Sequence, residues 1–209
     1  MGICQDRVVI ITGAGGGLGA AHAKVFASEG AKVIVNDINQ DAAQKVVDEI
    51  TAAGGTAIVN TSDITNYDDS LNAVKQAIDT FGDLHVVLNN AGINRDRMFA
   101  SMTEADWDAI MAVHLKGHFC ITSHAVHYWR GQSKEGKAVD ARIINTTSGA
   151  GLQGSVGQSN YAAAKAGIAA LTLNQAAELA RYGITANAIA PAARTGMTTA
   201  VESMAQRMA

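Results

Sequence analysis

The sequence predicts an α/β fold, a doubly wound parallel sheet with helices on both faces. Three observations lead to it. Short apolar runs alternate six times with longer amphipathic segments along the 209 residues. The runs are apolar at consecutive positions rather than alternate ones, as expected of strands that are buried on both faces. The chain is 48% hydrophobic with a net charge of −3, so it can build one large core. We therefore expect residues 1–209 to be a single domain.

Six strands are expected in chain order. Each is a short run rich in Val, Ile or Leu, and they occupy residues 8–12, 32–37, 56–60, 84–89, 142–147 and 184–190. Because parallel neighbours need a crossover of a dozen or more residues, a helix is expected in the intervals between them.

The intervals carry helical signals. Helices are expected from a glycine-rich turn to about residue 30, and over residues 40–53, 68–81, 103–130 and 161–181. The second and third end at Gly54 and Gly82, because glycine commonly terminates helices. The fourth begins with Thr103-Glu104-Ala105-Asp106, which resembles a capping box. The polar residues 131–140 predict a surface loop, and residues 198–208 again look helical.

Composition and termini limit the partners and the compartment. The 16 Lys and Arg are fewer than the 19 Asp and Glu and form no basic run, so no nucleic-acid partner is expected. Nowhere do 18 apolar residues follow one another, and the first residues lack the pattern of a signal peptide, so no membrane partner is expected. Cys4 and Cys120 show no metal or redox spacing and are expected to be free thiols. We therefore expect a cytoplasmic protein.

A glycine-rich turn, Thr12-Gly13-Ala14-Gly15-Gly16-Gly17-Leu18-Gly19, joins the first strand to the first helix. Glycines there permit a tight turn and a close approach of the backbone to a phosphate, and the helix N-terminus offers N–H groups to a pyrophosphate. No Lys follows the glycines, as an ATP- or GTP-binding P-loop would require. The turn therefore predicts a dinucleotide site, with a flexible loop as the alternative.

Asp37 ends the second strand, about 20 residues after the glycines. A carboxylate there can accept hydrogen bonds from the adenosine ribose and would repel a 2′-phosphate, and the turn has no Arg or Lys to hold that phosphate. NAD is therefore predicted in preference to NADP. The alternative is that Asp37 only caps the next helix.

Tyr161 and Lys165 lie at positions i and i+4, on one face of a helix. A nearby ammonium favours the phenolate, so we expect the pKa of Tyr161 to fall and Tyr161 to act as a general acid or base. Ser148 ends the fifth strand, and ligands of such sheets bind beyond the carboxyl ends of the strands.

Together these motifs resemble those of the classical short-chain dehydrogenases/reductases. Thr12 to Gly19 matches the TGxxxGxG turn, and Asn89-Asn90-Ala91-Gly92 matches the NNAG motif. Ser148, Tyr161 and Lys165 match the catalytic residues at the usual spacing, and the resemblance covers residues 7 to about 195. It implies a Rossmann-like sheet of strand order 3-2-1-4-5-6-7. It also implies NAD(P)-dependent oxidoreduction of a small alcohol or carbonyl substrate.

The resemblance further implies residue roles. Tyr161 would carry the hydroxyl proton, Ser148 would hydrogen-bond the reacting oxygen, and Lys165 would orient the ribose and lower the pKa of Tyr161. The cofactor-binding residues at the adenosine end are Gly13, Gly17, Leu18 and Gly19 of the turn, Asp37 at the adenosine ribose, and Asp63 and Ile64, which the resemblance places beside the adenine. Further along the cofactor it implies Asn90, Ala91 and Gly92, then Tyr161 and Lys165 at the nicotinamide ribose, and Thr195 near the carboxamide.

Three features depart from the family pattern. His114 stands where the family usually has Asn, and Pro191-Ala192 replaces the usual Pro-Gly. The chain ends at Ala209 within the expected substrate lid, before the seventh strand, and we favour an incomplete sequence as the explanation. Two roles for His114 are open: a neutral proton relay, which we favour, or a residue that only fills space.

The sequence indicates the substrate less specifically than it indicates the reaction. Residues 94–100, 106–108 and 113–117 resemble the (3R)-hydroxyacyl-CoA dehydrogenase part of peroxisomal multifunctional enzymes, which suggests a 3-hydroxyacyl-CoA substrate and a place in lipid metabolism. The alternatives in the same family are a 3-oxoacyl-carrier-protein reductase, which Asp37 disfavours, and a hydroxysteroid dehydrogenase. An alternative of another class is a nucleotide-sensing regulator without catalysis. The presence of Ser148, Tyr161 and Lys165 favours an enzyme.

Two further expectations concern metal and assembly. His114, His118, His124 and His127 lack a carboxylate or Cys at ligand spacing, so no metal site is expected. A homo-oligomer, dimer or tetramer, is expected to form through the helices at residues 102–130 and 161–181. The second is rich in alanine and would allow close helix packing, at Ala162, Ala163, Ala164, Ala166, Ala169 and Ala170.

Overall fold

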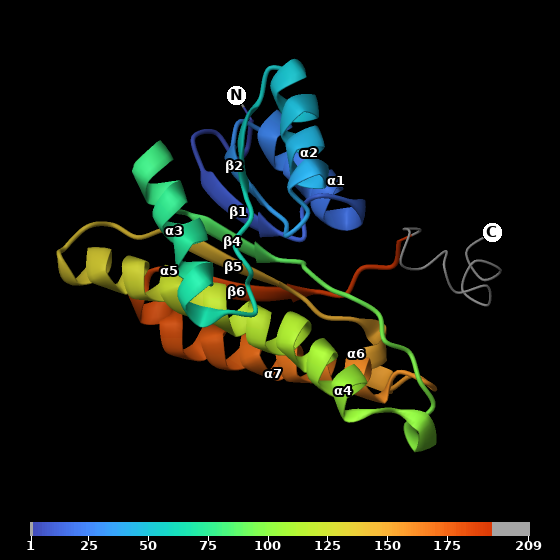
Figure 1. Cartoon of the computed structure of the whole chain (residues 1–209). Helices are drawn as coiled ribbons and strands as arrows, with labels where there is room; N and C mark the ends of the chain where they lie inside the picture. Colours follow the sequence, from blue (N-terminus) through green and yellow to red (C-terminus); the bar gives the residue numbers. More distant parts are fainter. Residues whose placement is uncertain (1, 194–209) are drawn as a thin grey trace.

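The computed structural model describes residues 2–193, which form a parallel six-stranded sheet between two layers of helices (Figure 1). The strand order is β3-β2-β1-β4-β5-β6, which confirms the predicted doubly wound fold. The strands are β1 (Val8–Thr12), β2 (Lys32–Asn36), β3 (Thr56–Asn60), β4 (Val86–Asn89), β5 (Ala141–Thr146) and β6 (Ile184–Ile189).

The central strands have the burial that their sequences predict. All five residues of β1 and all four of β4 are buried, since helices cover both faces of the sheet. The register of the strand pairs aligns their carboxyl ends: Thr12 of β1 pairs with Asn36 of β2, and Asn89 of β4 pairs with Asn145 of β5. The predicted strand 84–89 begins two residues later, at Val86, because its ladder with β1 starts there. The other strands agree to within a residue.

Two hydrophobic clusters define the helix layers. α1 (Gly17–Ser28) and α2 (Gln40–Ala52) cover one face of the sheet. α3 (Tyr67–Phe81), α5 (Gly117–Lys134) and α7 (Ser159–Leu179) cover the other. Trp129 of α5 is fully buried in the second cluster, and its indole N–H donates to the carbonyl of Leu84.

The long helix predicted over residues 103–130 is interrupted. α4 (Glu104–Ile110) starts with the predicted capping box, in which Thr103 and Asp106 bond reciprocally. The next turn, η2 (Met111–Lys116), is π-helical, and the backbone N–H of Gly117 reaches the carbonyl of Ala112 five residues back. α5 then continues to Lys134, so the predicted surface loop is wrong for residues 131–134. Those residues form the last turn of α5 instead, where residues 131–133 are half-buried and Lys134 is exposed.

Two short helical segments were not predicted: η1 (Phe99–Ser101) and α6 (Gly149–Gln153). The helix predicted over residues 161–181 is α7 followed by the 3₁₀ turn η3 (Ala180–Tyr182). Segments of five residues or fewer are too short to show a helical period. α6 matters for the site, because it begins directly after Ser148.

The predicted helix at residues 198–208, the lid and Thr195 lie outside the described residues. Within residues 2–193, no helix combines the length and apolarity needed to cross a membrane.

Candidate active site

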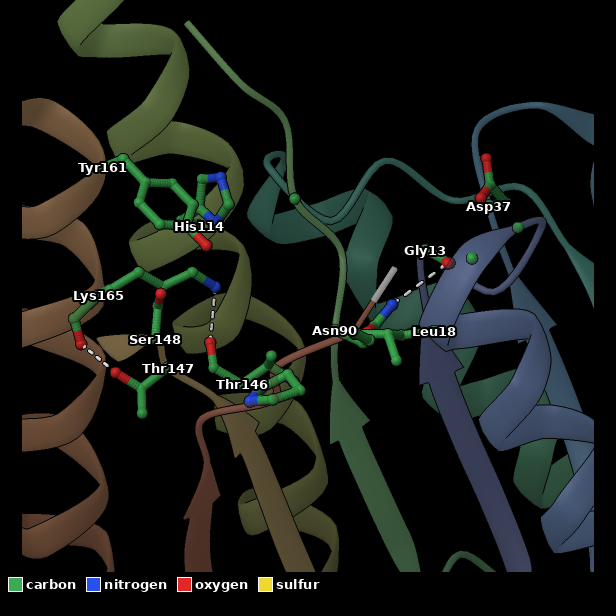
Figure 2. Close-up of a pocket in the computed structure, with 15 residues that line it drawn as sticks. Gly13, Leu18, Asp37, Asn90, His114, Thr146, Thr147, Ser148, Tyr161 and Lys165 are labelled. Carbon is green, nitrogen blue, oxygen red and sulfur yellow. Dashed lines mark hydrogen bonds between the residues drawn. The ribbon is translucent and has the colours of Figure 1, made fainter. Parts of the chain in front are cut away.

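A cavity of about 380 Å³ opens at the carboxyl ends of the central strands (Figure 2). Such a position is where ligands bind in open α/β sheets. Its lining joins the glycine-rich turn to the predicted catalytic residues: Gly13, Gly16, Gly17, Leu18, Asp37, Asn90, Gly92, His114, Thr146, Thr147, Ser148, Tyr161, Lys165, Pro191 and Ala193.

The glycine-rich turn lies tightly against the segment that follows β4. Gly13 has a φ of +62°, and a Cβ there would lie 2.7 Å from the Cα of Ala91. A Cβ on Gly19 would lie 2.2 Å from the carbonyl oxygen of Gly13. Thr12 Oγ1 accepts from the backbone N–H groups of Asn90 and Ala91, at 3.0 and 3.1 Å. Gly19 and Ala91 do not line the cavity. They pack against the turn and so help to hold its conformation.

Asp37 lines the cavity and also bonds the turn. Its Oδ2 accepts from the backbone N–H of Gly15 at 3.0 Å, and its Oδ1 accepts from that of Asn39 at 2.9 Å. Asp37 does not provide the side-chain N-cap of α2, because Asn39 does so by accepting from the backbone N–H of Ala42. The alternative interpretation, a residue that only caps the helix, is wrong.

Asp63 and Ile64 are not brought to this cavity. Asp63 is exposed, and its Oδ1 accepts from the backbone N–H and the hydroxyl of Thr65. Ile64 is buried in the core beside Gly117. Their adenine contact stays a prediction from the resemblance. Thr195 lies outside residues 2–193, although Pro191 and Ala193, just before it, do line the cavity.

Ser148 and Tyr161 face each other across the start of α6. Ser148 is the N-cap of α6, and its Oγ accepts from the backbone N–H of Ala150 at 3.2 Å. Burial raises the pKa of Tyr161 above its usual value, a hydrogen bond with Ser148 opposes this shift, and the negative charge of Asp96 adds to it.

The pKa of Tyr161 therefore corrects the sequence-based expectation. We expected Lys165 to lower it, but burial outweighs the other influences and the pKa rises. The geometry explains the difference. The Lys165 ammonium lies 5.5 Å from the centroid of the Tyr161 ring and donates to the carbonyl of Thr146 at 2.6 Å (Figure 2).

Lys165 is buried at the end of the sheet, with 2% of its surface exposed. Burial lowers its pKa to about 8. Its backbone is fixed as well, because the Thr147 hydroxyl donates to its carbonyl at 2.6 Å. α6 packs closely on this part of α7: a Cβ on Gly151 would lie 2.6 Å from the Lys165 carbonyl carbon.

His114 enters the cavity from the π-helical turn. Its ring meets that of Tyr161 edge-on, with centroids 5.1 Å apart (Figure 2). Nε2 lies 2.8 Å from the carbonyl oxygen of Ile93 and 3.1 Å from the Ile93 nitrogen. A Cβ on Gly92 would lie 2.6 Å from the ring, so this glycine makes room for the imidazole.

Burial and the charge of Lys165 lower the pKa of His114 to about 4, although a bond to the Ile93 backbone opposes the shift. The ring is therefore neutral at pH 7, as expected. Nδ1 is buried and makes no hydrogen bond within the described part of the chain, so the two-sided bonding expected of a relay is present only at Nε2.

Thr146, Thr147 and Gly16 line the cavity without having been singled out as site residues. Their positions offered a signal: Thr146 ends β5, Thr147 follows it directly before Ser148, and Gly16 lies inside the glycine-rich turn. Residues 2–193 contain no group of three or more His, Cys, Asp or Glu side chains that could hold a metal ion.

Comparison with known proteins decides the family. A model of the short-chain dehydrogenase family matches residues 7–206. The chain belongs to the short-chain dehydrogenase family. A crystal structure of a short-chain dehydrogenase from Mycobacterium avium superposes with a TM-score of 0.91 at 61% identity, covering 94% of this chain and 71% of that one.

Two curated relatives of this short-chain dehydrogenase carry informative names. The hydroxyacyl-CoA dehydrogenase ChsB1 of Mycobacterium tuberculosis is 50% identical over 204 residues, which are 94% of this chain and 64% of the relative. The peroxisomal multifunctional enzyme type 2 of Mus musculus is 45% identical over 206 residues, which are 94% of this chain and 27% of that enzyme. The chain thus spans less than two thirds of either relative.

Proposed function

We propose that this chain is an NAD-dependent oxidoreductase that interconverts a secondary alcohol and a ketone. One observation carries the proposal: Ser148, Tyr161 and Lys165 open onto the same cavity as the glycine-rich turn. A nucleotide held at the turn and a hydroxyl held by Ser148 and Tyr161 would therefore meet in one cavity. Dehydrogenases of this family use a nicotinamide cofactor, NAD or NADP, which supports the same reaction class.

The turn fits a dinucleotide. Gly16 is the N-cap of α1, and a Cβ added to it would meet no described atom within 4 Å, so a pyrophosphate has room beside the N–H groups of the helix start. Asp37 lies where it can accept hydrogen bonds from the adenosine ribose, which favours NAD. Tyr161 and Lys165 would hold the nicotinamide ribose at the other end. The bound nicotinamide supplies the carbon that accepts or donates hydride.

Tyr161 is the proposed proton carrier. When the alcohol is oxidised, the phenolate takes the hydroxyl proton as the C–H hydride leaves. When the ketone is reduced, the phenol returns that proton to the oxygen, which Ser148 also hydrogen-bonds. Because the pKa of Tyr161 is raised, the phenol is protonated at neutral pH, and alcohol oxidation should accelerate as the pH rises.

The proposed substrate is a 3-hydroxyacyl-CoA. Relatives named for hydroxyacyl-CoA dehydrogenation and for peroxisomal multifunctional activity support this class and a role in lipid metabolism. The alternatives of the same family are a 3-oxoacyl-carrier-protein and a hydroxysteroid. A non-catalytic nucleotide sensor would have no need of the complete Ser148, Tyr161 and Lys165 set.

The experiment is a panel of (3R)- and (3S)-hydroxyacyl-CoAs, hydroxysteroids and simple secondary alcohols, each assayed with NAD and with NADP. We expect the highest kcat/KM with a hydroxyacyl-CoA and NAD. A higher kcat/KM with a hydroxysteroid would mean that the substrate is a hydroxysteroid and not a 3-hydroxyacyl-CoA. If no alcohol or ketone were turned over, while NAD still bound, the sensor would be favoured instead.

We also propose a homo-oligomer that pairs through α5 and α7. Phe119 of α5 is 50% exposed and Leu173 of α7 is 74% exposed, and α7 exposes Ala166 and Ala170 on the same side as Leu173. Of the alanines expected at the interface, Ala164 is excluded because it is fully buried within the subunit.

Sedimentation at micromolar concentration tests this assembly. We expect a dimer or tetramer that Ala170→Glu dissociates, because the new carboxylate would be buried between subunits. Val25→Glu is the matched control, since Val25 is also exposed but lies on α1. A monodisperse monomer would contradict the proposal.

The proposed compartment is the cytoplasm, supported by two cysteines that are both free. Relatives named as peroxisomal make the peroxisome the alternative, and fractionation of the source cells distinguishes the two.

A further inference from the structure

The side chain of Asn160 joins three segments beside the proposed proton carrier. Asn160 is fully buried and directly precedes Tyr161 on α7. Its Oδ1 accepts from the backbone N–H of Tyr161 at 2.8 Å. Its Nδ2 donates to the backbone carbonyl oxygens of Arg95 and Asp106, both at 3.1 Å. One amide therefore connects α7 to the chain that follows β4 and to α4.

The start of α7 explains this use of the amide. The first backbone N–H groups of a helix have no partner within the helix and are commonly bonded by the side chain of the N-cap residue. Here the N-cap residue, Gln158, makes no such bond. Its Nε2 donates instead to Asp96 Oδ2 at 3.0 Å. Asn160 bonds the Tyr161 N–H from inside the helix, so its two amide hydrogens remain for other segments.

These bonds hold residues 94–98, which we call the 94–98 loop. The loop is exposed and lies outside the named helices and strands, and in Figure 1 the green chain that contains it runs past α6. Arg97 forms an isolated parallel bridge with Gln158, and its backbone N–H donates to the carbonyl of Gly157 at 2.8 Å. The Arg97 guanidinium also lies 3.6 Å from the Asp106 carboxylate. The loop is therefore attached to the start of α7 and to α4.

We propose that Asn160 is a positioning residue that holds the 94–98 loop as a wall on the substrate side of the cavity and keeps Tyr161 in register with it. Gly92 lines the cavity two residues before the loop, and Tyr161 lines it directly after Asn160. The cofactor is proposed to extend from Tyr161 to the glycine-rich turn, so the loop would meet the substrate instead. The inference rests on the proposed function.

A merely structural Asn160 would behave differently. Its loss would lower stability, and kcat, KM and NAD affinity would deteriorate together. If Asn160 positions the loop, its bonds have separable effects: the two donated bonds set the KM of the substrate, and the bond accepted from Tyr161 sets kcat. NAD affinity depends on neither, because Thr12 separately holds the chain at Asn90.

The test compares Asn160→Asp with Asn160→Ala in steady-state turnover of the best hydroxyacyl-CoA. An ionised Asp keeps an oxygen for the Tyr161 N–H but cannot donate to the two carbonyls. We expect Asn160→Asp to raise KM about tenfold and to change kcat less than about threefold. Asn160→Ala should raise KM similarly and also lower kcat about tenfold, because both kinds of bond are lost.

Cofactor affinity and a control on the same helix separate positioning from stability. The Kd for NAD should change less than about threefold in both variants. Thr172→Val is the matched control, because it removes a buried bond to Asn145 on α7 without touching the loop. It should lower the Tm and leave KM unchanged. A parallel loss of kcat, KM and NAD affinity in Asn160→Asp would show a merely structural residue and overturn the inference.

Asp96 tests the same loop without a change to a buried residue. Asp96 is exposed, so its variants should fold even where those of Asn160 do not. Asp96→Ala removes the acceptor of the Gln158 amide, whereas Asp96→Asn keeps one. We expect Asp96→Ala to raise KM about threefold or more and Asp96→Asn to leave it unchanged. Each variant is assayed at its own optimal pH, because the Asp96 charge also acts on the pKa of Tyr161. Equal KM values in the two Asp96 variants overturn the inference.

Hydrogen exchange in the cofactor-free protein tests the loop without turnover. The Arg97 N–H, which donates to Gly157, should exchange about tenfold faster or more in Asn160→Asp, or in Asp96→Ala if the former does not fold. The Ala91 N–H, bonded to Thr12, should keep its rate. An unchanged rate at Arg97 overturns the inference. Lack of turnover by the unaltered enzyme would refute the proposed function and leave the exchange result standing.

Discussion

At the scale of single residues, burial sets the charge of the groups that meet in the cavity. It raises the pKa of Tyr161, lowers that of Lys165 to about 8 and lowers that of His114 to about 4. At pH 7 the cavity therefore holds a phenol, an ammonium and a neutral imidazole. Displaced pKa values that cluster in a cleft are typical of catalytic sites.

Cofactor choice depends on one carboxylate. We expect the unaltered protein to prefer NAD over NADP by at least about tenfold in kcat/KM, because Asp37 would repel the 2′-phosphate. Asp37→Ala combined with Ile38→Arg should remove most of that preference, since an arginine can pair with the phosphate. Ile38 is 77% exposed, so the arginine has room.

Asp37→Asn and Ile38→Arg alone are the controls for this prediction. The amide oxygen of Asn can still accept from the backbone N–H of Gly15, so the turn should survive while the charge is lost. Equal kcat/KM values for the two cofactors in the unaltered protein would refute the role of Asp37.

His114 yields a prediction about pH. His114→Asn should retain most activity, whereas His114→Leu should lose about tenfold or more, because only Asn keeps a group that can donate and accept. The pH–rate profiles of the variants test this. Equal activity of the two variants at every pH would make His114 a packing residue.

The same imidazole should make the fold acid-labile. Its pKa is about 4 in the folded protein and 6.5 in the unfolded chain, so the unfolded state binds the proton more tightly. The stability linked to the neutral ring is complete above pH 6.5 and is lost as the pH falls from there towards 4. Thermal unfolding between pH 7 and 4 should show a smaller fall in Tm for His114→Asn than for the unaltered protein. An identical fall would indicate that the ring is not held neutral.

At the scale of elements, the turn between β1 and α1 has one glycine that supports the fold and one that faces open space. Gly13→Ala should lower the Tm, because Gly13 has a positive φ and its Cβ would meet the Ala91 backbone. Gly16→Ala should leave the Tm almost unchanged but weaken NAD binding about tenfold or more, since the methyl group would enter the space proposed for the pyrophosphate. Calorimetry measures both effects. Unchanged NAD affinity in Gly16→Ala would place the pyrophosphate elsewhere.

Elements also show where sequence reasoning succeeds and fails. The run of Val and Ile predicted β1 to the residue, because burial on both faces leaves a continuous apolar signal. The bounds of the edge strand β3 were also predicted to the residue, although only Ala57 and Asn60 of that strand are buried. The π-helical turn at Met111–Lys116 was missed, since its residues fit an ordinary helix and its packing against α7 joins segments that are distant in the sequence. That turn delivers His114 to the cavity.

At the scale of the whole molecule, parallel strands bring distant motifs to one end of the sheet. Gly13, Asn90, Ser148 and Tyr161 were predicted to share a site, and they line one cavity. The charge state of Tyr161 was not predictable, because it depends on how deeply the phenol is buried and on where Lys165 directs its protons. The adenine contact of Asp63 stays a prediction, because Asp63 lies outside the lining of this cavity and its Oδ1 accepts from Thr65.

The central claim is that Tyr161 carries the proton in an NAD-dependent alcohol oxidation. The most direct measurement is NADH formation by the unaltered protein and by Tyr161→Phe on the best hydroxyacyl-CoA, with NAD affinity measured on both. We predict that Tyr161→Phe loses at least about a thousandfold in kcat while its Kd for NAD changes less than about threefold, because only the proton carrier is removed. A Tyr161→Phe protein that kept more than a few per cent of the activity would contradict the account.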